Sequence, residues 1–523
     1  MGVIIWSLIA RFMKRQRLSQ IKRILVRNKT IVSSVPGFIL LFCSVLFADF
    51  LPSAFGAYAD QRILLSLSLV VVVALGLVRM FCRRGEGTSA LQDMWPFSLL
   101  VFSFCFAALQ YRLGPFYFIE PVFYTLYFLA FGITGYLIRA EQVARDVSLA
   151  FVTVAAVACF FYAAMTITVY LFAINDNFSR LDRIIPWGFV NIRYWSHIAT
   201  WVIPLFPLAL LITPFKESRL WRLGVSFSAA VWWWILFMSS SRGSMVGLFV
   251  GFILVWVCFG KTASPWVKLF ARFAIYGLIA WFVLSLIIPS LVFDEIQVRG
   301  VKGHSSGRIP LWREALAMSL QHFPFGMGPQ AWITHETLTD GYHASPKLGH
   351  PHNMYLMWAA EYGWISIVGL VVLCGFALRC LLCQIYSARV GDNPDALYLI
   401  AFAASVTAAL VHAGVSAVFI APGSMLIGLP MLTIFWALIK PESRPPRVCD
   451  SGKRPQLLIS AGPVVMVVFL IASSYWFHEV LKYRQAMSDD LPYYQEEVGE
   501  GYLPRFWFHG NFPRPLSQMP PEQ

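Results

Sequence analysis

The sequence contains few charged residues. Asp, Glu, Lys and Arg make up 13% of its 523 residues, whereas hydrophobic residues make up 58%. Since about a quarter of the residues of an average soluble domain are charged, this composition excludes a soluble globular protein. Long polar stretches are also scarce, because residues 292–353 form the only long polar segment between two hydrophobic spans. The chain is therefore predicted to be an integral membrane protein.

Several sequence motifs are also missing, and each missing motif excludes a property of the protein. No small-residue cleavage site follows the first apolar run, so no cleaved signal peptide is predicted. None of the nine cysteines falls in a loop predicted to lie outside the cell, which argues against disulfides there. No His-Glu-x-x-His motif or similar ligand spacing occurs, so neither a metal nor another cofactor is predicted. No nucleic-acid-reading motif accompanies the net charge of +14, so no nucleic acid partner is predicted.

Apolar runs recur along nearly the whole chain. Each is about 20 residues long, which is the length that crosses a hydrocarbon core as an α-helix. We predict an all-α integral membrane protein, a polytopic bundle of 12 to 13 transmembrane helices, in which the third and twelfth spans are short enough to be tilted or re-entrant. The predicted spans are residues 31–51, 63–81, 94–110, 118–138, 147–173, 195–213, 223–240, 243–260, 267–291, 354–383, 396–420, 424–439 and 457–480.

The distribution of Lys and Arg predicts the orientation of these spans, because basic residues tend to stay on the cytoplasmic side. We place the basic residues 11–29 in the cytoplasm. Because successive spans cross the membrane in opposite directions, the basic groups at residues 79–84, 216–222 and 440–454 then also lie in the cytoplasm. The predicted localisation is the bacterial inner membrane, with residues 292–353 on the periplasmic face. The tail is too short for a core of its own, so we expect it to pack on the outer surface or to stay loose. The predicted parts are a basic cytoplasmic segment (1–30), helices one to nine (31–291), a periplasmic catalytic loop with short helices (292–353), helices ten to thirteen (354–480) and a periplasmic tail (481–523).

Arg242 lies in a short turn between two apolar spans, within Ser239-Ser240-Ser241-Arg242-Gly243. A charge at the centre of a bilayer costs about 2.5–3.5 kcal/mol, so an arginine flanked by so much apolar chain is a functional candidate. The alternative is an anchor whose side chain reaches the lipid headgroups.

The polar loop contains further candidates at its two ends. Near its start, apolar residues repeat at helical spacing after Arg308, with Pro310 in the first turn, so Arg308 is predicted to begin a helix. At its end, His350 and His352 precede Asn353, a predicted cap of the tenth span. Helix N-termini bind anions and disfavour a charged imidazole, so two arginines and a neutral His352 suggest chemistry on a phosphate or diphosphate leaving group.

Other interpretations of these residues remain open. Arg308 could pair with Glu314 or Glu336 on a solvated loop face. His350 and His352 could bind a metal together with His343 or Glu361. Arg193 opens the sixth span on the same face, where it could contact substrate or anchor an interfacial aromatic belt.

The order of these motifs resembles the bacterial O-antigen ligase and O-antigen polymerase superfamily of membrane glycosyltransferases. The order of the motifs matches the family over residues 188–369, and the arrangement of spans matches it over the whole chain. The chain differs from the family in the extra span and the tail that follow Pro441. The resembling residues are Ser241-Arg242-Gly243, Arg308 before Trp312, Gly326 and Gly328, His352-Asn353, Glu361, Gly363 and the segment 188–204.

The resemblance implies a helical fold of the GT-C type and a transfer reaction. An inverting, metal-independent enzyme would move a glycan from undecaprenyl diphosphate to an acceptor hydroxyl, such as one on lipid A-core. Arg242 and Arg308 would bind the diphosphate, and His352 would orient or deprotonate the acceptor. His350 and Asn353 would hold His352 or the sugar.

Four functions remain open from the sequence. An O-antigen ligase is favoured over a repeat-unit polymerase and a protein O-oligosaccharyl ligase, which share the donor and differ in the acceptor. A transporter of lipid-linked glycans is an alternative of another class. Ionisable residues at mid-span or paired broken helices are typical of transporters, and neither pattern is apparent in the sequence.

Overall fold

The structure, a computed structural model, is built from helices. It describes residues 29–82, 87–110, 114–189, 191–293, 307–345, 348–390, 395–440, 456–497, 504–508 and 510–514, and these residues contain no strand. Most of the predicted basic segment 1–30, part of the predicted loop (294–306) and the predicted cytoplasmic connector (441–455) lie outside the described residues.

Long helices alternate with short connections along the chain. Three 3₁₀ turns, at Ala48–Phe50, Leu181–Arg183 and Gly260–Ala263, and one π-helical segment, Val283–Ile287, interrupt the α-helices. The α-helices are α3 (Lys29–Leu46), α4 (Ala57–Cys82), α5 (Gly87–Gln110), α6 (Ile119–Ala140), α7 (Ala144–Asn175), α8 (Ile192–Val202), α9 (Leu205–Ile212), α10 (Arg219–Met238), α11 (Arg242–Phe259), α12 (Ser264–Phe282), α13 (Ile288–Val292), α14 (Arg308–Gln321), α15 (Ala331–Thr334), α16 (Asp340–His343), α17 (Met354–Tyr362), α18 (Trp364–Val390), α19 (Ala396–Ala413), α20 (Pro422–Ile439), α21 (Gln456–Asp489) and α22 (Leu491–Glu496).

The predicted all-α polytopic architecture is confirmed. Within the described residues, eleven helical stretches are long and apolar enough to cross a membrane. One of them, Arg242–Val292, contains both α11 and α12, which meet at the turn Gly260–Ala263. Counting α11 and α12 separately gives twelve spans, and the shorter apolar helix α3 corresponds to the first of the thirteen predicted segments.

Two predicted spans are broken at a glycine or a proline, and a third, 267–291, is interrupted by the π-helical segment between α12 and α13. The predicted span 354–383 divides at Gly363, whose φ of 81° ends α17 and lets α18 start in a new direction. The crossing helix is then Trp364–Arg389, while α17 packs against α14. The predicted span 195–213 divides at Ile203 and Pro204, because proline cannot donate a backbone hydrogen bond to the preceding turn.

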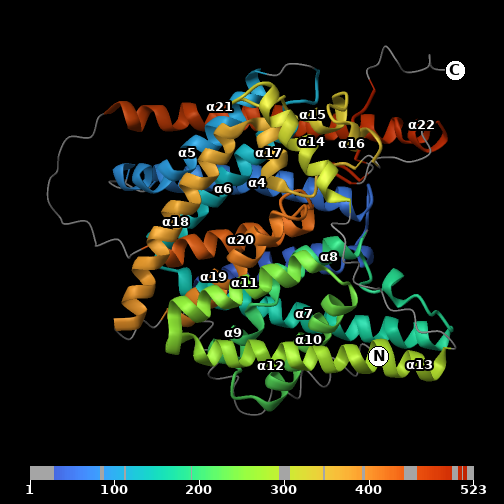
Figure 1. Cartoon of the computed structure of the whole chain (residues 1–523). Coiled ribbons are helices and arrows are strands. Elements are labelled where there is room, and N and C mark those ends of the chain that lie inside the picture. The colour runs from blue at the N-terminus through green and yellow to red at the C-terminus, as the bar shows by residue number, and fades with distance from the viewer. Residues whose placement is uncertain are drawn as a thin grey trace.

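The helices divide into a buried centre and an apolar periphery (Figure 1). Most residues of α20, α6 and the pair α8 and α9 are buried inside the protein. The helices α12, α18 and α21 instead leave large apolar side chains such as Leu278, Val371 and Ile471 exposed on their outer surfaces. In Figure 1, α21 runs along one edge of the bundle and α12 along the opposite edge. An apolar outer surface is what a lipid environment requires.

Three glycines bring α11 unusually close to α19. Added Cβ atoms at Gly247 and Gly251 would lie 2.4 Å from the carbonyl oxygens of Ala408 and Ala404, respectively. One turn earlier, a Cβ at Gly243 would lie 2.6 Å from Cδ2 of His412. Small residues at every fourth position let two membrane helices approach at backbone distance. This contact fixes the start of α11, and with it Arg242, beside His412.

The predicted location of the C-terminal tail is wrong in one part. Residues 504–507 do not lie on the outer surface but are buried in the bundle, where Phe506 packs against Phe123 of α6 and Tyr483 of α21. Buried side chains of Arg62 and Tyr58 on α4 donate hydrogen bonds to main-chain carbonyls of this segment. These long-range hydrogen bonds leave no local signature in the sequence.

We predict that Gly247→Ala destabilises the protein. The added Cβ would press on the carbonyl oxygen of Ala408, and such overpacking typically costs about 1–3 kcal/mol, which exceeds the gain in helix propensity. Thermal unfolding in detergent, followed by tryptophan fluorescence, measures the loss. Gly375→Ala on α18 is the matched control, because a Cβ at that helical position meets nothing within 4 Å. Equal melting temperatures for the two variants would contradict the proposed close contact.

Candidate active site

Arg193 lies in the first turn of α8. The side-chain oxygen of Asn191 caps this helix by accepting a hydrogen bond of 2.9 Å from the backbone N–H of Arg193. The following residues Trp195, Ser196 and His197 are buried, so the amphipathic start of α8 leaves Arg193 exposed at the end of the bundle.

Arg242 is the first residue of α11. The turn before it contains Ser240, a non-glycine residue with a left-handed φ of 50°. The hydroxyl of Ser241 donates to that of Ser196 at 2.9 Å, which ties this turn to α8. The exposed guanidinium of Arg242 is therefore positioned by the same helix that positions Arg193.

Arg308 is the first residue of α14, as predicted for the start of a loop helix. Gly307 precedes it with a φ of 70°, and Leu311, Ala315 and Met318 on the inner face join a small core with Trp332. The alternative ion pair with Glu314 is not formed, because both oxygens of that carboxylate accept backbone N–H groups of residues 338 and 339, at 2.7 and 2.8 Å. Arg308 itself is half-buried.

The glycine turn after α14 docks on the end of α17. Gly326 and Gly363 both have left-handed φ values, and a Cβ on either one would clash with the backbone of the other segment. The backbone N–H groups of Met327 and Gly328 donate to the carbonyls of Ala360 and Glu361, at 2.7 and 3.0 Å. This contact attaches the loop helix, and therefore Arg308, to the helix that follows His352.

His350 and His352 stand together before α17. Their ring centroids are 4.4 Å apart, and Nδ1 of His350 accepts the backbone N–H of His352 at 3.1 Å. His352 has a φ of 54°, which is sterically unfavourable for a residue with a Cβ. Asn353 caps α17, because its side-chain oxygen accepts from the N–H groups of Tyr355 and Leu356. The sugar contact predicted for Asn353 stays a prediction.

These arginines and histidines lie close enough to influence one another's pKa values. Burial lowers the pKa of Arg308, and the nearby Arg193 and Arg242 lower it further. Burial lowers the pKa of His352 to about 3, helped by Arg193 and Arg308. The pKa of His350 lies well below its usual range, mainly through burial and then through His352 and Arg505. Both histidines are therefore neutral near pH 7. The fold brings together the arginines and histidines that the sequence singled out.

Two further histidines lie behind Arg242. His412 on α19 is within 3.0 Å of the Thr200 hydroxyl and 3.3 Å of the Ser244 hydroxyl through Nδ1. His197 lies 2.7 Å from the Ser416 hydroxyl, and its ring centroid is 4.9 Å from that of His412. His197 belongs to the sequence cluster around Arg193, but His412 stands in an ordinary apolar helix. The close packing of Gly243 and the contact with Ser244, rather than any pattern in the sequence, reveal that His412 lies near Arg242.

The ligand set suggested for a metal is not assembled in the described part of the chain. Among those residues, no group of three or more His, Cys, Asp or Glu side chains is placed to share one ion. Glu361, a candidate third ligand, instead accepts a hydrogen bond from the backbone N–H of Trp332 at 3.0 Å and forms an ion pair with Arg505.

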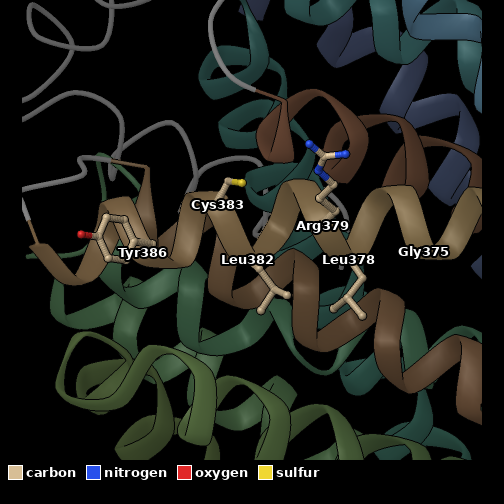
Figure 2. Close-up of a pocket in the computed structure, with 6 residues that line it drawn as sticks. All are labelled: Gly375, Leu378, Arg379, Leu382, Cys383 and Tyr386. Atoms are coloured by element: carbon tan, nitrogen blue, oxygen red, sulfur yellow. The ribbon is translucent and has the colours of Figure 1, made fainter.

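A shallow surface hollow lies apart from these residues. It is lined entirely by α18, from Gly375 through Arg379 to Tyr386 (Figure 2). Exposed Leu378 and Leu382 form its apolar part. It contains no residue of the arginine and histidine cluster, so Arg379 serves below as a control.

The helices and the sequence together define the class of this protein. Its apolar helices define a multi-pass membrane protein, with a cationic cluster at one end of the bundle. Residues 227–374 match the family model described as O-antigen ligase, which supports the predicted superfamily. The matched region runs from α10 to α18, so it includes Arg242, Arg308 and His352, whereas Arg193 lies before it. No curated protein matches the chain. The region from α10 to α18 is thus similar to the O-antigen ligase family.

We predict that removing one arginine raises the pKa of His352. In Arg308→Ala or Arg193→Ala, one positive charge that disfavours the imidazolium is lost, so the value moves from about 3 towards the ordinary 6.5. Added pyrophosphate moves the pKa in the same direction, because an anion stabilises the protonated ring. NMR titration of protein with labelled histidines measures both shifts, and His352→Gln assigns the signal.

Arg379→Ala is the control for this titration, since it removes an arginine remote from the cluster and leaves the pKa of His352 unchanged. An equal shift in the control and in Arg308→Ala, or no shift in any variant, would contradict the arrangement.

Proposed function

We propose that the protein is an O-antigen ligase. It transfers a glycan from undecaprenyl diphosphate to a sugar hydroxyl of lipid A-core, with inversion at the anomeric carbon and without a metal. The observation that carries this proposal is the mutual proximity of Arg193, Arg242 and Arg308, of which Arg193 and Arg308 add to the effect of burial in keeping His352 neutral. The match of residues 227–374 to the O-antigen ligase family supports the same reaction class.

The arginines suit the leaving group. Each stands in the first turn of a helix, where the helix dipole already provides a partial positive charge. Three guanidinium groups at three such positions repel one another, so a bound diphosphate relieves their repulsion. When the bond between the anomeric carbon and the diphosphate oxygen breaks, its electron pair goes to that oxygen, and the arginines stabilise the new charge.

His352 suits the role of the base. As the acceptor oxygen forms its bond to the anomeric carbon, its hydroxyl proton passes to the neutral imidazole. A histidine with a pKa of about 3 is a weak base, but a bound diphosphate offsets the arginine charges that lower this value. Donor binding would thus strengthen the base that the second substrate needs. His350 holds the backbone N–H of His352 and would keep its ring in place.

We place this site on the periplasmic face of the inner membrane. The other end of the bundle carries basic residues such as Arg79, Arg139 and Lys440, at the ends of α4, α6 and α20. Basic residues at the ends of spans are typical of the cytoplasmic side. In this orientation the site lies at the periplasmic surface of the membrane, where it would meet a glycan donor that is anchored in the lipid.

We predict that the cluster variants lose glycan transfer. With purified protein, an undecaprenyl-diphosphate-linked glycan and lipid A-core, His352→Ala lowers kcat by about 10²- to 10⁴-fold through loss of the base. Arg242→Ala and Arg308→Ala lower it by about 10²- to 10³-fold, because the leaving group loses a charge partner. Arg379→Ala is the control and retains transfer.

All reactions of this series contain a chelator. Full transfer by the three cluster variants would overturn the assignment of the site. Loss of wild-type transfer on adding the chelator would instead favour a metal bound by His350 and His352.

We predict that a deletion strain accumulates long glycans on undecaprenyl diphosphate and makes lipopolysaccharide without O-antigen. This outcome follows because a ligase acts after the chain has been extended. Analysis of the lipid-linked and lipopolysaccharide fractions distinguishes the alternatives. Single repeats on lipopolysaccharide would indicate a polymerase, unmodified pilin or another bare protein would indicate a protein ligase, and absence of lipid-linked glycan on the periplasmic side would indicate a transporter.

A further inference from the structure

Arg505, in the C-terminal tail, lies at the centre of a buried ionic group. Its side chain is 1% exposed. Nε is 3.3 Å from a carboxylate oxygen of Glu120 on α6, and Nη2 forms an ion pair with Glu361 at the end of α17. Gln330 donates a hydrogen bond to the same oxygen of Glu120. The two carboxylates occupy two edges of the guanidinium, so Arg505 is not arranged to bind a substrate anion.

The main chain around Arg505 is held as firmly as its side chain. The carbonyl of Arg505 accepts the Tyr58 hydroxyl at 2.5 Å and a guanidinium N–H of Arg62 at 3.3 Å. The carbonyl of Phe506 accepts Nε of Arg62 at 2.9 Å, and the phenyl ring lies 4.7 Å from that guanidinium. Buried donors on α4 thus hold this segment of the tail, and Arg62 also ties it to the bundle by donating to the carbonyl of Ile420.

The remaining edge of Arg505 reaches the histidine loop. Nη1 donates to the carbonyl of Gly349, the residue directly before His350, at 3.4 Å. The neighbouring carbonyl of Leu348 accepts the indole N–H of Trp332 at 2.7 Å, and the backbone N–H of Trp332 donates to Glu361. Arg505 therefore holds this stretch directly through Gly349 and indirectly through Glu361.

The held stretch leads into the strained residue of the site. His352, with its left-handed φ of 54°, is fixed on the downstream side because Asn353 caps α17. A strained backbone persists only where its surroundings determine it from both sides. The contact of Arg505 with Gly349 provides the upstream restraint.

The same tail segment touches the other wall of the site. The hydroxyl of Tyr194, the residue after Arg193, donates to the carbonyl of Pro504 at 3.4 Å. Residues 504 and 505 thus contact the start of α8 and the loop before His350. The distance between Arg193 and His352 depends on a segment from the far end of the chain.

We propose that Arg505 is a positioning residue that holds the loop 348–352, so that His352 faces the arginine cluster. The C-terminal tail is then an integral part of the site. This inference rests on the proposed function for the role of His352 in transfer, but the positioning itself can be measured without any activity.

The test compares Arg505→Lys with Arg514→Lys. A lysine keeps the charge between Glu120 and Glu361 but has one nitrogen, so it cannot also hold Gly349. Arg514 is the matched control, because it lies in the same tail and pairs with Asp490 at 2.5 Å, away from the histidine loop. A third protein, Arg505→Met with Glu120→Gln and Glu361→Gln, removes the buried charges together and leaves no unpaired carboxylate.

The first readout is hydrogen exchange of the peptide that contains residues 348–356, measured on the full chain in detergent. We expect faster exchange in Arg505→Lys and in the triple variant, and unchanged exchange in Arg514→Lys. The second readout is transfer from undecaprenyl-diphosphate-linked glycan to lipid A-core. In Arg505→Lys and in the triple variant we expect kcat to fall by about 10- to 100-fold, because His352 is misplaced. The KM for the donor changes little, because the arginines that bind the diphosphate stay in place.

Each outcome decides one of the two proposals. Wild-type exchange in both Arg505 proteins overturns the positioning role, as does a fall in kcat that Arg514→Lys shares. If His352→Ala transfers glycan normally while the Arg505 proteins still exchange faster, the proposed function fails and the positioning role stands.

Discussion

The repulsion among Arg193, Arg242 and Arg308 is the constraint on which the rest of the site depends. Each guanidinium stands at a helix N-terminus, where the helix dipole already disfavours a positive charge. Bringing three such groups together costs free energy in the empty protein, and a bound anion recovers it. Burial is the main reason that His352 stays neutral, and the charges of Arg193 and Arg308 add to it. The arginines that favour a bound diphosphate thus also help to keep the imidazole unprotonated.

Close packing between helices positions Arg242 and Arg308. The glycines of α11 lie against the backbone of α19, which fixes the start of α11 to within the size of one methyl group. The backbone contact between Gly326 and Gly363 attaches the loop helix α14 to α17 in the same way. Two glycine contacts therefore set the separation of Arg242, Arg308 and His352, and a rigid frame can hold like charges in place.

Several features follow from local pattern and could be predicted from the sequence. Apolar runs of membrane-spanning length indicated the helices, and helical spacing after Arg308 indicated α14. His412 and Arg505 could not be recognised in this way, because His412 lies in an ordinary apolar helix and the aromatic neighbours of Arg505 give no sign of its buried carboxylate partners. The break at Gly363 was also missed, since the apolar run continues across it and only the left-handed backbone ends α17.

The sequence alone was enough to predict that the protein resides in a membrane, where most of its spans lie, and which arginines and histidines stand at the ends of those spans. These properties depend on composition and spacing within one helix or loop. Contacts in the tertiary structure, in contrast, bring the arginines into one region, bury His352 so that its pKa falls further, and carry the tail to Gly349. Those properties depend on burial and on contacts between residues far apart in the chain, such as Arg505 with Glu120, which no local spacing encodes.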